Sequence, residues 1–237
     1  MNLVLIFESD FIRENTVRLK ERRLEHIQNI LQAEPGQTLK VGFLNGLIGL
    51  GKVTEITQQF VDLEVELYDN PPASIPITAI LALPRPKMVR RIIQNIASIG
   101  VKELYFINSY HVEKSYWQSP ALKAETIREH LIHGLEQGQD TVMPNVHLRK
   151  RFKPFMEDEL PSIAQNAKLR LLAHPYNSQP CPQELEGNTI IALGPERGFT
   201  KYEADKFIDN QFKPTSLGKR ILKVEIALTF LLGKLCP

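Results

Sequence analysis

The first 70 residues contain short apolar segments with the spacing of β-strands. Four such segments lie at 3–7, 38–43, 47–54 and 60–67, and the last alternates between apolar and acidic residues, as half-buried strands do. Segment 22–31 instead places its leucines and isoleucines at the spacing of one helical face, which predicts a helix. Short strands combined with one helix predict a small β-barrel for residues 1–70.

The pattern changes after a proline-rich segment at 71–76. Prolines fix the backbone and cannot donate hydrogen bonds, so this segment is predicted to be a semi-rigid linker before a second domain at 77–237. Strands are predicted at 77–83, 104–107, 169–173 and 189–193, and helices at 88–99, 121–135, 200–210 and 224–235. This alternation predicts an α/β domain with a mostly parallel sheet covered by helices.

The composition is that of a globular protein. Of 237 residues, 43% are hydrophobic and 24% are charged, which allows a sizeable core. Two cysteines, Cys181 and Cys236, cannot form a disulfide framework or a cysteine-based zinc site.

The apolar segment 3–7 is too short for a signal peptide, and the longest uncharged segment, 70–84, is too short to span a membrane. We therefore expect a cytoplasmic protein without membrane contact.

The net charge of +2 is unevenly distributed. Residues 1–75 carry a balance of −4, and residues 76–237 carry +6. The second part contains two basic clusters: Arg85, Lys87, Arg90 and Arg91, then Arg149, Lys150, Arg151 and Lys153. Such clusters can bind a polyanion such as nucleic acid, although each is also compatible with a solvated surface.

The most informative segment is 190–200, Ile-Ile-Ala-Leu-Gly-Pro-Glu-Arg-Gly-Phe-Thr. A buried strand ends at Gly194-Pro195, and a helix is predicted to begin near Thr200, with Glu203 at the capping-box spacing. Ligands of open α/β sheets bind beyond the carboxyl ends of strands. Gly194 and Gly198 allow close backbone approach. A functional loop is favoured over a plain turn with a surface ion pair.

A second segment, 216–227, leads a glycine-containing loop into the apolar last helix. Arg220 and Lys223 precede the helix, where cations oppose the helix dipole. This conflict indicates that the two cations bind a partner outside the helix, for example an anion. Solvated cations at a helix start are the alternative interpretation.

Three other groups have open interpretations. His130 and His133 are three residues apart on a predicted helix, but no third ligand is evident, so no metal site is expected. His174 follows a strand and is compatible with a pocket wall or with a structural role. The aromatic residues Tyr110, Tyr116 and Trp117 lie close in sequence to His111 and Lys114. They could stack on bases, but a core or dimer-interface role is favoured.

The segments Leu-Gly-Pro-Glu-Arg-Gly-Phe (193–199) and Ser-Leu-Gly-Lys-Arg-Ile-Leu-Lys-Val-Glu-Ile-Ala (216–227) resemble the closing motifs of the bacterial 16S ribosomal RNA uridine-N3 methyltransferases. This family belongs to the SPOUT superfamily of trefoil-knotted methyltransferases. Weaker similarities lie at 22–27, 99–101, 136–137 and 143–144, so the resemblance covers nearly the whole chain. The chain departs from the family pattern at Arg197, Lys223 and Ile226, where Gly, Arg and Thr are common.

The resemblance implies an α/β fold with a small N-terminal PUA-like β-barrel that helps to hold RNA, and a C-terminal domain whose last helix passes through a loop to form a knot. It also implies S-adenosyl-L-methionine (SAM) as cofactor, a homodimer, and ribosomal RNA of the small subunit as partner. The implied cofactor residues are Leu172, Ala173, His174, Leu193, Gly194, Pro195, Gly198, Leu217, Gly218, Ile221 and Leu222.

The implied reaction moves a methyl group from a sulfonium to N3 of a uridine, which must be unpaired and must lose its N3 proton. Glu196 is the candidate proton acceptor or orienting carboxylate, and Arg220 is the candidate cation near the developing anion. The candidate phosphate contacts are Arg22, Arg23, His26, Lys87, Arg90 and Arg91.

Two alternatives remain open. The first is a ribosomal RNA-binding or assembly factor that retains the fold but lacks chemistry, an interpretation that Lys223 and Ile226 favour. The second is a methyltransferase that acts on another RNA or on another base atom.

Overall fold

The computed structural model describes residues 2–175, 178–185 and 187–236. The chain divides into two compact units. The first contains residues 1–73, 97–100 and 131–143, and the second contains 74–96, 101–130 and 144–237. The first unit therefore includes two short segments from far along the chain, which the sequence limits of 1–70 did not include.

The first unit contains a six-stranded sheet in the order β1-β4-β5-β6-β3-β2. The strands are β1 (Val4–Ile6), β2 (Phe11–Arg13), β3 (Thr16–Leu19), β4 (Thr38–Phe43), β5 (Ile48–Ile56) and β6 (Val61–Asp69). β1 pairs with β4 in parallel, and the other pairs are antiparallel. The four predicted strands are confirmed. β2 and β3 were missed, because each has only three or four residues and no long apolar run.

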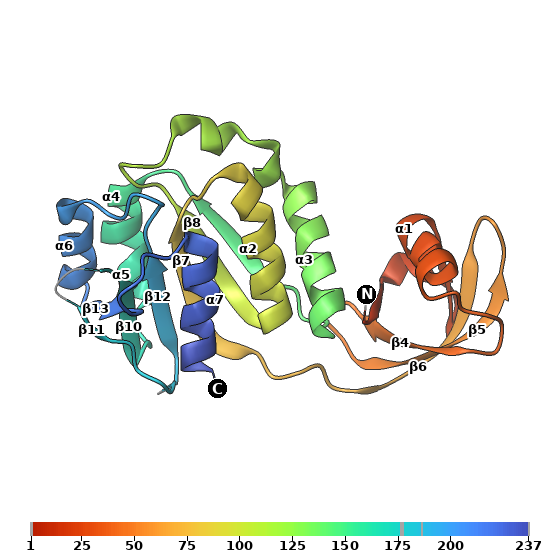
Figure 1. Ribbon diagram of the computed structural model, residues 1–237. Coiled ribbons are helices and arrows are strands. Elements are labelled where there is room, and N and C mark those ends of the chain that lie inside the picture. The colour runs from red at the N-terminus through yellow and green to blue at the C-terminus, as the bar shows by residue number, and fades with distance from the viewer. Residues whose placement is uncertain (1, 176–177, 186, 237) are drawn as a thin grey trace. The chain divides into compact units, whose positions relative to one another are not determined.

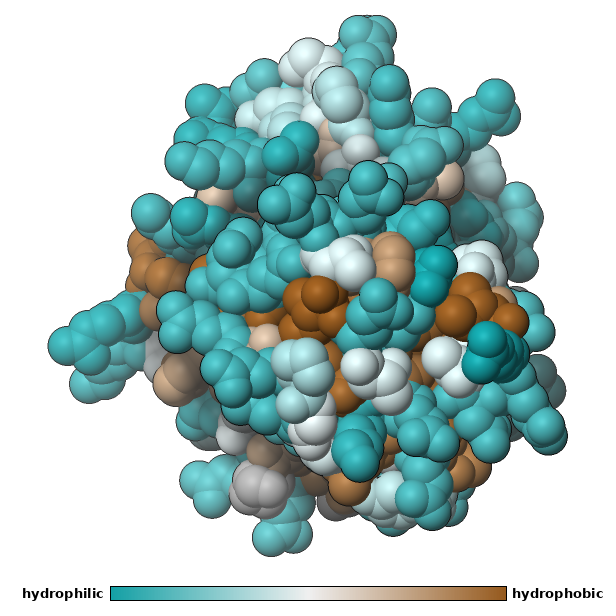
Figure 2. Space-filling view, turned by 90° about the vertical axis from the view of Figure 1, so that its right-hand side faces the viewer, coloured by the Kyte–Doolittle hydropathy of each residue, from teal (hydrophilic) through white to brown (hydrophobic). Residues whose placement is uncertain are grey.

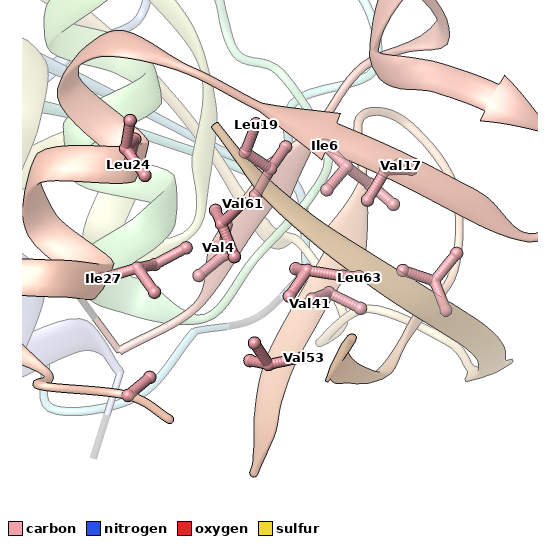
Figure 3. Close-up of a cluster of buried hydrophobic side chains, with 12 residues drawn as sticks. Val4, Ile6, Val17, Leu19, Leu24, Ile27, Val41, Val53, Val61 and Leu63 are labelled. Atoms are coloured by element: carbon pink, nitrogen blue, oxygen red, sulfur yellow. The ribbon is translucent and has the colours of Figure 1, made fainter. Parts of the chain in front are cut away.

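The core of this unit is aliphatic. Figure 3 shows Leu24 and Ile27 beside strand residues such as Val4, Leu19 and Val61, and each of these five side chains is at most 5% exposed. The predicted helix at 22–31 is confirmed in position, as α1 (Glu21–Glu25) and a π-helical turn over His26–Ile30. The apolar face of this helix packs on the sheet. Its leucines and isoleucines therefore recur at the spacing of one helical face.

Segment 131–143 completes the first unit. The Thr141 hydroxyl donates to the Gly46 carbonyl at 2.6 Å, and the Asn45 amide donates to the Thr141 carbonyl at 2.8 Å. Gly138 is required by close packing, since a Cβ there would lie 2.5 Å from the Ser98 carbonyl oxygen. These contacts hold the end of a long helix against the Asn45 turn.

The second unit contains a seven-stranded sheet in the order β11-β13-β10-β12-β7-β8-β9, in which every pairing is parallel. The strands are β7 (Ile75–Ala82), β8 (Val101–Ile107), β9 (Asn145–Arg149), β10 (Leu169–Ala173), β11 (Gln179–Pro180), β12 (Thr189–Leu193) and β13 (Lys213–Ser216). All five residues of β12 are buried, as expected for a central parallel strand. The predicted α/β class is confirmed.

Helices flank this sheet (Figure 1). They are α2 (Pro86–Ile99), α3 (Ala124–Gly138), α4 (Phe152–Pro154), α5 (Leu160–Ile163), α6 (Lys201–Asp209) and α7 (Val224–Leu235). The last residues of α2 and the second half of α3 belong to the first unit. α2 and α7 run side by side, and α4, α5 and α6 gather on the left of the view. The four predicted helices are confirmed. Thr200 caps α6 and Glu203 completes the predicted capping box.

The sequence missed the strands β9, β11 and β13. β9 and β11 are edge strands, and β13 contains Pro214. Short edge strands and strands with proline lack the apolar run that marks a buried strand.

No helix within the described residues is both long and apolar enough to cross a bilayer. The face drawn in Figure 2 is mostly hydrophilic, and its apolar patches are interrupted by hydrophilic side chains. Scattered apolar residues of this kind are normal on protein surfaces.

Candidate functional site

Three strands end together at one edge of the parallel sheet. β10 lies between β12 and β13, and its last residue, Ala173, is in register with both Leu193 and Thr215. The His174 amide continues the ladder by donating to the Thr215 carbonyl at 3.1 Å. The loops that begin at His174, at Gly194 and just after β13 therefore leave the sheet side by side. These are the three segments that the sequence analysis singled out as cofactor walls.

The loop after β12 is a tight turn that requires its glycines. A Cβ on Gly194 would lie 2.9 Å from the Phe199 amide nitrogen. Gly198 has φ = +73°, and its amide donates to the Pro195 carbonyl at 2.7 Å. Pro195 and Phe199 are buried, so the turn is fixed at both ends. Gly194 is therefore required by the packing of the turn against its own backbone, and its contact with a ligand stays a prediction.

Glu196 is at the exposed side of this turn and faces Arg85. The Arg85 Nε lies 3.7 Å from Glu196 Oε1, and the Arg85 backbone amide donates to the same oxygen at 3.5 Å. Arg85 follows β7, and β7 is next to β12 with Leu81 in register with Leu193. The adjacent strand ends therefore hold the pair together.

The sequence pattern did not connect Arg85 with Glu196, and Arg85 was predicted only as part of a basic cluster. The available signal was the Pro84-Arg85-Pro86 segment after a predicted strand, but the neighbour of that strand was unknown. In the structure, Glu196 makes its ion pair with Arg85 and not with Arg220, within the described residues. Arg220 is exposed.

The loop after β13, residues 217–223, is the least buried of the three. Gly218 has φ = +121°, a conformation that favours glycine, and its amide donates to the Ser216 hydroxyl at 3.2 Å. A Cβ on Gly218 would meet nothing within 4 Å, so its need for glycine comes from the backbone conformation and not from packing. Ile221 is 95% exposed and Leu222 is partly buried. The structure therefore does not bring Ile221 into a wall.

The other expected cofactor residues are in strand β10 and at the start of the loop after β13. Leu172 is fully buried, while Ala173, His174 and Leu217 are partly buried. Burial lowers the pKa of His174, because the imidazolium form is disfavoured away from water. His174 is therefore a neutral group just after β10 at neutral pH.

Arg22 and Arg23 make internal ion pairs in the first unit. Arg22 forms a bidentate pair with Glu136 at 2.9 Å for both bonds, and Arg23 forms one with Asp10 at 2.5 and 2.7 Å. The Arg23 side chain is 14% exposed and that of Arg22 is 44% exposed. Both charges stabilise buried carboxylates, which the sequence did not reveal. Their role as phosphate contacts stays a prediction.

His26 lies in the same region. Its Nε2 is buried without a hydrogen-bond partner among the described residues. Burial is the main cause that lowers its pKa, so His26 is uncharged at neutral pH. A neutral, shielded imidazole offers little to a phosphate.

Lys87, Arg90 and Arg91 are exposed on the first half of α2. None of the three forms an ion pair among the described residues. They remain the most accessible of the predicted phosphate contacts.

The structure gives His130 a partner other than a metal. Its Nδ1 lies 3.0 Å from Gln94 Nε2. Within the described ranges, no group of three histidine, cysteine or acidic residues is placed to hold a metal ion.

Comparison with known proteins gives consistent results. A family model described as RNA methyltransferase domain matches residues 71–235. Ribosomal RNA small subunit methyltransferase E of Treponema pallidum is 25% identical, over 96% of this chain and 87% of that protein. Ribosomal RNA small subunit methyltransferase E 1 of Borreliella burgdorferi is 29% identical, over 96% and 94% of the two chains.

Solved structures share the fold. Ribosomal RNA small subunit methyltransferase E from Neisseria gonorrhoeae, bound to SAM, has a TM-score of 0.75 with 18% identity, over 98% of this chain and 95% of that one. A Legionella pneumophila protein in complex with SAM has a TM-score of 0.74 with 20% identity, over 98% and 96%. At these identities the likeness establishes a common fold.

Proposed function

This chain belongs to the family with an RNA methyltransferase domain, and from that premise we propose that it transfers a methyl group from SAM to ribosomal RNA of the small subunit. The observation that carries the proposal is the meeting of three loops where β10, β12 and β13 end. The relatives named for small-subunit ribosomal RNA methylation span nearly the same length as this chain, which supports the same substrate class.

The proposed SAM site is at the sheet edge where these loops meet. Gly218 is exposed and carries no side chain, which supports close contact between its backbone and the cofactor. The backbone of Leu193, Leu217 and Gly218 would supply polar groups to the cofactor, and Leu172, which is fully buried, would support the site from behind. SAM would supply an electrophilic methyl group on a sulfonium.

We propose further that the loop 217–223 and α7 form a trefoil knot, and that the first unit is a PUA-like RNA-binding barrel. The knot follows from the family resemblance, and it would explain why the loops of β12 and β13 share one crevice. The six-stranded sheet of the first unit is compatible with a PUA-like barrel. A ribosomal RNA substrate implies that the reaction takes place in the cytoplasm.

The proposed target atom is N3 of a uridine. This nitrogen carries a proton, so a base must accept the proton before the nitrogen can attack the methyl group. Glu196 is proposed to accept or orient this proton, because its carboxylate is partly exposed in the loop after β12. Arg85 and Arg220 are the cations proposed to stabilise the uridine anion.

The RNA backbone is proposed to contact Lys87, Arg90 and Arg91, which are exposed, and also Arg22, which keeps 44% of its side-chain surface. Arg23 and His26 are also among the phosphate contacts predicted from the sequence, but their burial makes them weaker candidates for this role. Phosphate contacts of this kind make affinity fall with salt concentration.

A homodimer is proposed through the surface of α2 and α7. The groove between them has a volume of about 680 Å³. Ile226 and Phe230 of α7 line it and are 50% and 45% exposed, so an apolar surface is open to a partner. Phe230→Asp should convert a dimer into a monomer in light scattering. A monomeric wild-type protein would contradict the dimer.

The position of Ile226 also bears on the alternative of a factor without chemistry. Ile226 lies in this groove and not among the sheet-edge loops. Its departure from the family pattern therefore does not remove a group from the proposed cofactor crevice, and the enzyme is the function that the geometry favours.

Two measurements test the proposal. Titration calorimetry should show SAM binding, and absence of binding would contradict a SAM-dependent enzyme. Mass spectrometry of small-subunit ribosomal RNA should show one methylated uridine in the wild-type strain. This methylation should be absent from a strain without the gene and should return when the gene is restored. Unchanged RNA would favour the non-catalytic factor, and a methyl group elsewhere would favour another target.

A further inference from the structure

A cavity lies at the ends of the neighbouring strands β8 and β9 and extends to Thr200, which follows the loop after β12. Its volume is about 710 Å³. Its wall combines aromatic and basic side chains, and those used in the argument are Ser109, Tyr110, Lys114, Trp117, Lys150 and Tyr202. We propose that this cavity binds an unpaired nucleotide of the substrate RNA next to the nucleotide that is methylated. The inference rests on the proposed function, for which it names a second RNA subsite.

Aromatic faces are open to a ligand in this cavity. Tyr110 is 80% exposed and Tyr202 is 54% exposed, although tyrosine rings are usually partly buried. Trp117 is held in place by a hydrogen bond from its Nε1 to Asn108 Oδ1 at 2.9 Å. Fixed and exposed rings of this kind stack on unpaired bases of any sequence.

Two lysines give the cavity a positive charge. Lys114 and Lys150 are exposed and form no ion pair among the described residues. The one carboxylate in the wall, Glu203, is 3% exposed and already accepts hydrogen bonds from the Tyr110 amide and from Thr200. The unpaired charge facing a ligand is therefore positive, which suits a phosphate.

A buried hydroxyl in the wall also lacks a partner. Ser109 is 3% exposed, and its Oγ makes no hydrogen bond in the described structure. Such a group costs stability until it is paired. A polar edge of a stacked base is a suitable partner.

One hydrogen bond connects the segment at Tyr110 and His111 to the loop after β12, and a second connects it to α6. His111 Nδ1 lies 3.0 Å from the Gly198 carbonyl oxygen, and the Tyr110 amide donates to Glu203 Oε1 at 2.7 Å. Gly198 is in the same turn as Glu196. The cavity is thus fixed relative to the proposed proton acceptor, which is the reason for assigning it to a nucleotide adjacent to the target.

Binding of a fluorescein-labelled oligouridylate of about ten nucleotides tests the inference, since sites of about 4–16 nucleotides are usual for such proteins. Tyr110→Ala and Tyr202→Ala should each weaken binding about tenfold, and Tyr202→Phe should stay within about twofold, because the ring alone stacks. Lys114→Gln with Lys150→Gln should reduce the salt dependence of binding. Lys213→Gln is the matched control for the lysine variants, because Lys213 is exposed but outside the cavity.

The outcomes are distinguishable from failure of the proposed function. SAM binding by calorimetry should be unchanged in all of these variants. If wild-type protein binds SAM and methylates RNA, but the tyrosine variants bind the oligonucleotide like wild type, the subsite is wrong and the proposed function stands. If the variants change only the oligomeric state in light scattering, the cavity holds a second copy of the chain and the inference is overturned.

Discussion

Arg85 and Glu196 lie 111 residues apart in sequence, and their side chains meet at 3.7 Å. Both are at the ends of adjacent parallel strands, β7 and β12. Their exposed fractions are 69% and 34%, and ion pairs exposed to this extent contribute about 1 kcal/mol or less to stability. The pair therefore affects the charge distribution at the ends of these strands more than it affects the stability of the fold.

Glu196→Gln should lower kcat about 100-fold or more, because the group proposed to accept the N3 proton is lost. Arg85→Gln should lower kcat about tenfold. The double variant should be no slower than Glu196→Gln, since residues that act as one unit are not additive. The measurement is single-turnover methylation of ribosomal RNA, with the melting temperature as a control. If the loss of kcat in the double variant equals the product of the two single losses, the two residues act independently.

Gly194→Ala should destabilise the protein by about 1–3 kcal/mol and weaken SAM binding, because the added methyl group would press on the Phe199 amide at 2.9 Å. Gly233→Ala is the matched control. Gly233 is in α7 with nothing within 4 Å of an added Cβ, so alanine there should raise stability by about 0.5–1 kcal/mol. Denaturant unfolding and calorimetry measure both effects. Normal SAM affinity in Gly194→Ala would remove this glycine from the cofactor site.

Arg23→Met should destabilise the protein by about 3–5 kcal/mol, because Asp10 would be left as a buried carboxylate without its partner. Arg13→Met is the control: Arg13 is exposed in β2, and its loss should change stability by less than about 0.5 kcal/mol. Denaturant unfolding and RNA binding are measured on the same samples. Wild-type stability together with weaker RNA binding would instead support Arg23 as a phosphate contact.

SAM affinity should rise as the pH increases from about 5 to 7. Burial has already lowered the pKa of His174 below its ordinary value of 6.5, and a ligand over the side chain would lower it further, because burial disfavours the imidazolium. Protonated His174 must lose its proton before SAM binds, so acid weakens binding. Calorimetry across this pH range should show that SAM affinity rises with pH in the wild-type protein and changes less with pH in His174→Gln. Equal slopes would place His174 away from the cofactor.

The sequence alone determined most individual elements. The strands 169–173 and 189–193 and the helix 224–235 have the predicted limits, because continuous apolar runs and helical spacing are local consequences of burial. The Gly194 turn and the Thr200 cap were predicted for the same reason: their geometry depends on neighbours within a few residues.

Tertiary structure alone decided which elements are neighbours. β10 pairs with both β12 and β13, although β13 contains Pro214 and has no apolar run that marks it as a strand. Arg85 was assigned to Glu196, and Arg23 to Asp10, only once the strand order and the first-unit packing were known. Periodicity reports how deeply a residue is buried but not what it is buried against, because partners separated by many residues are chosen by the packing of the whole chain.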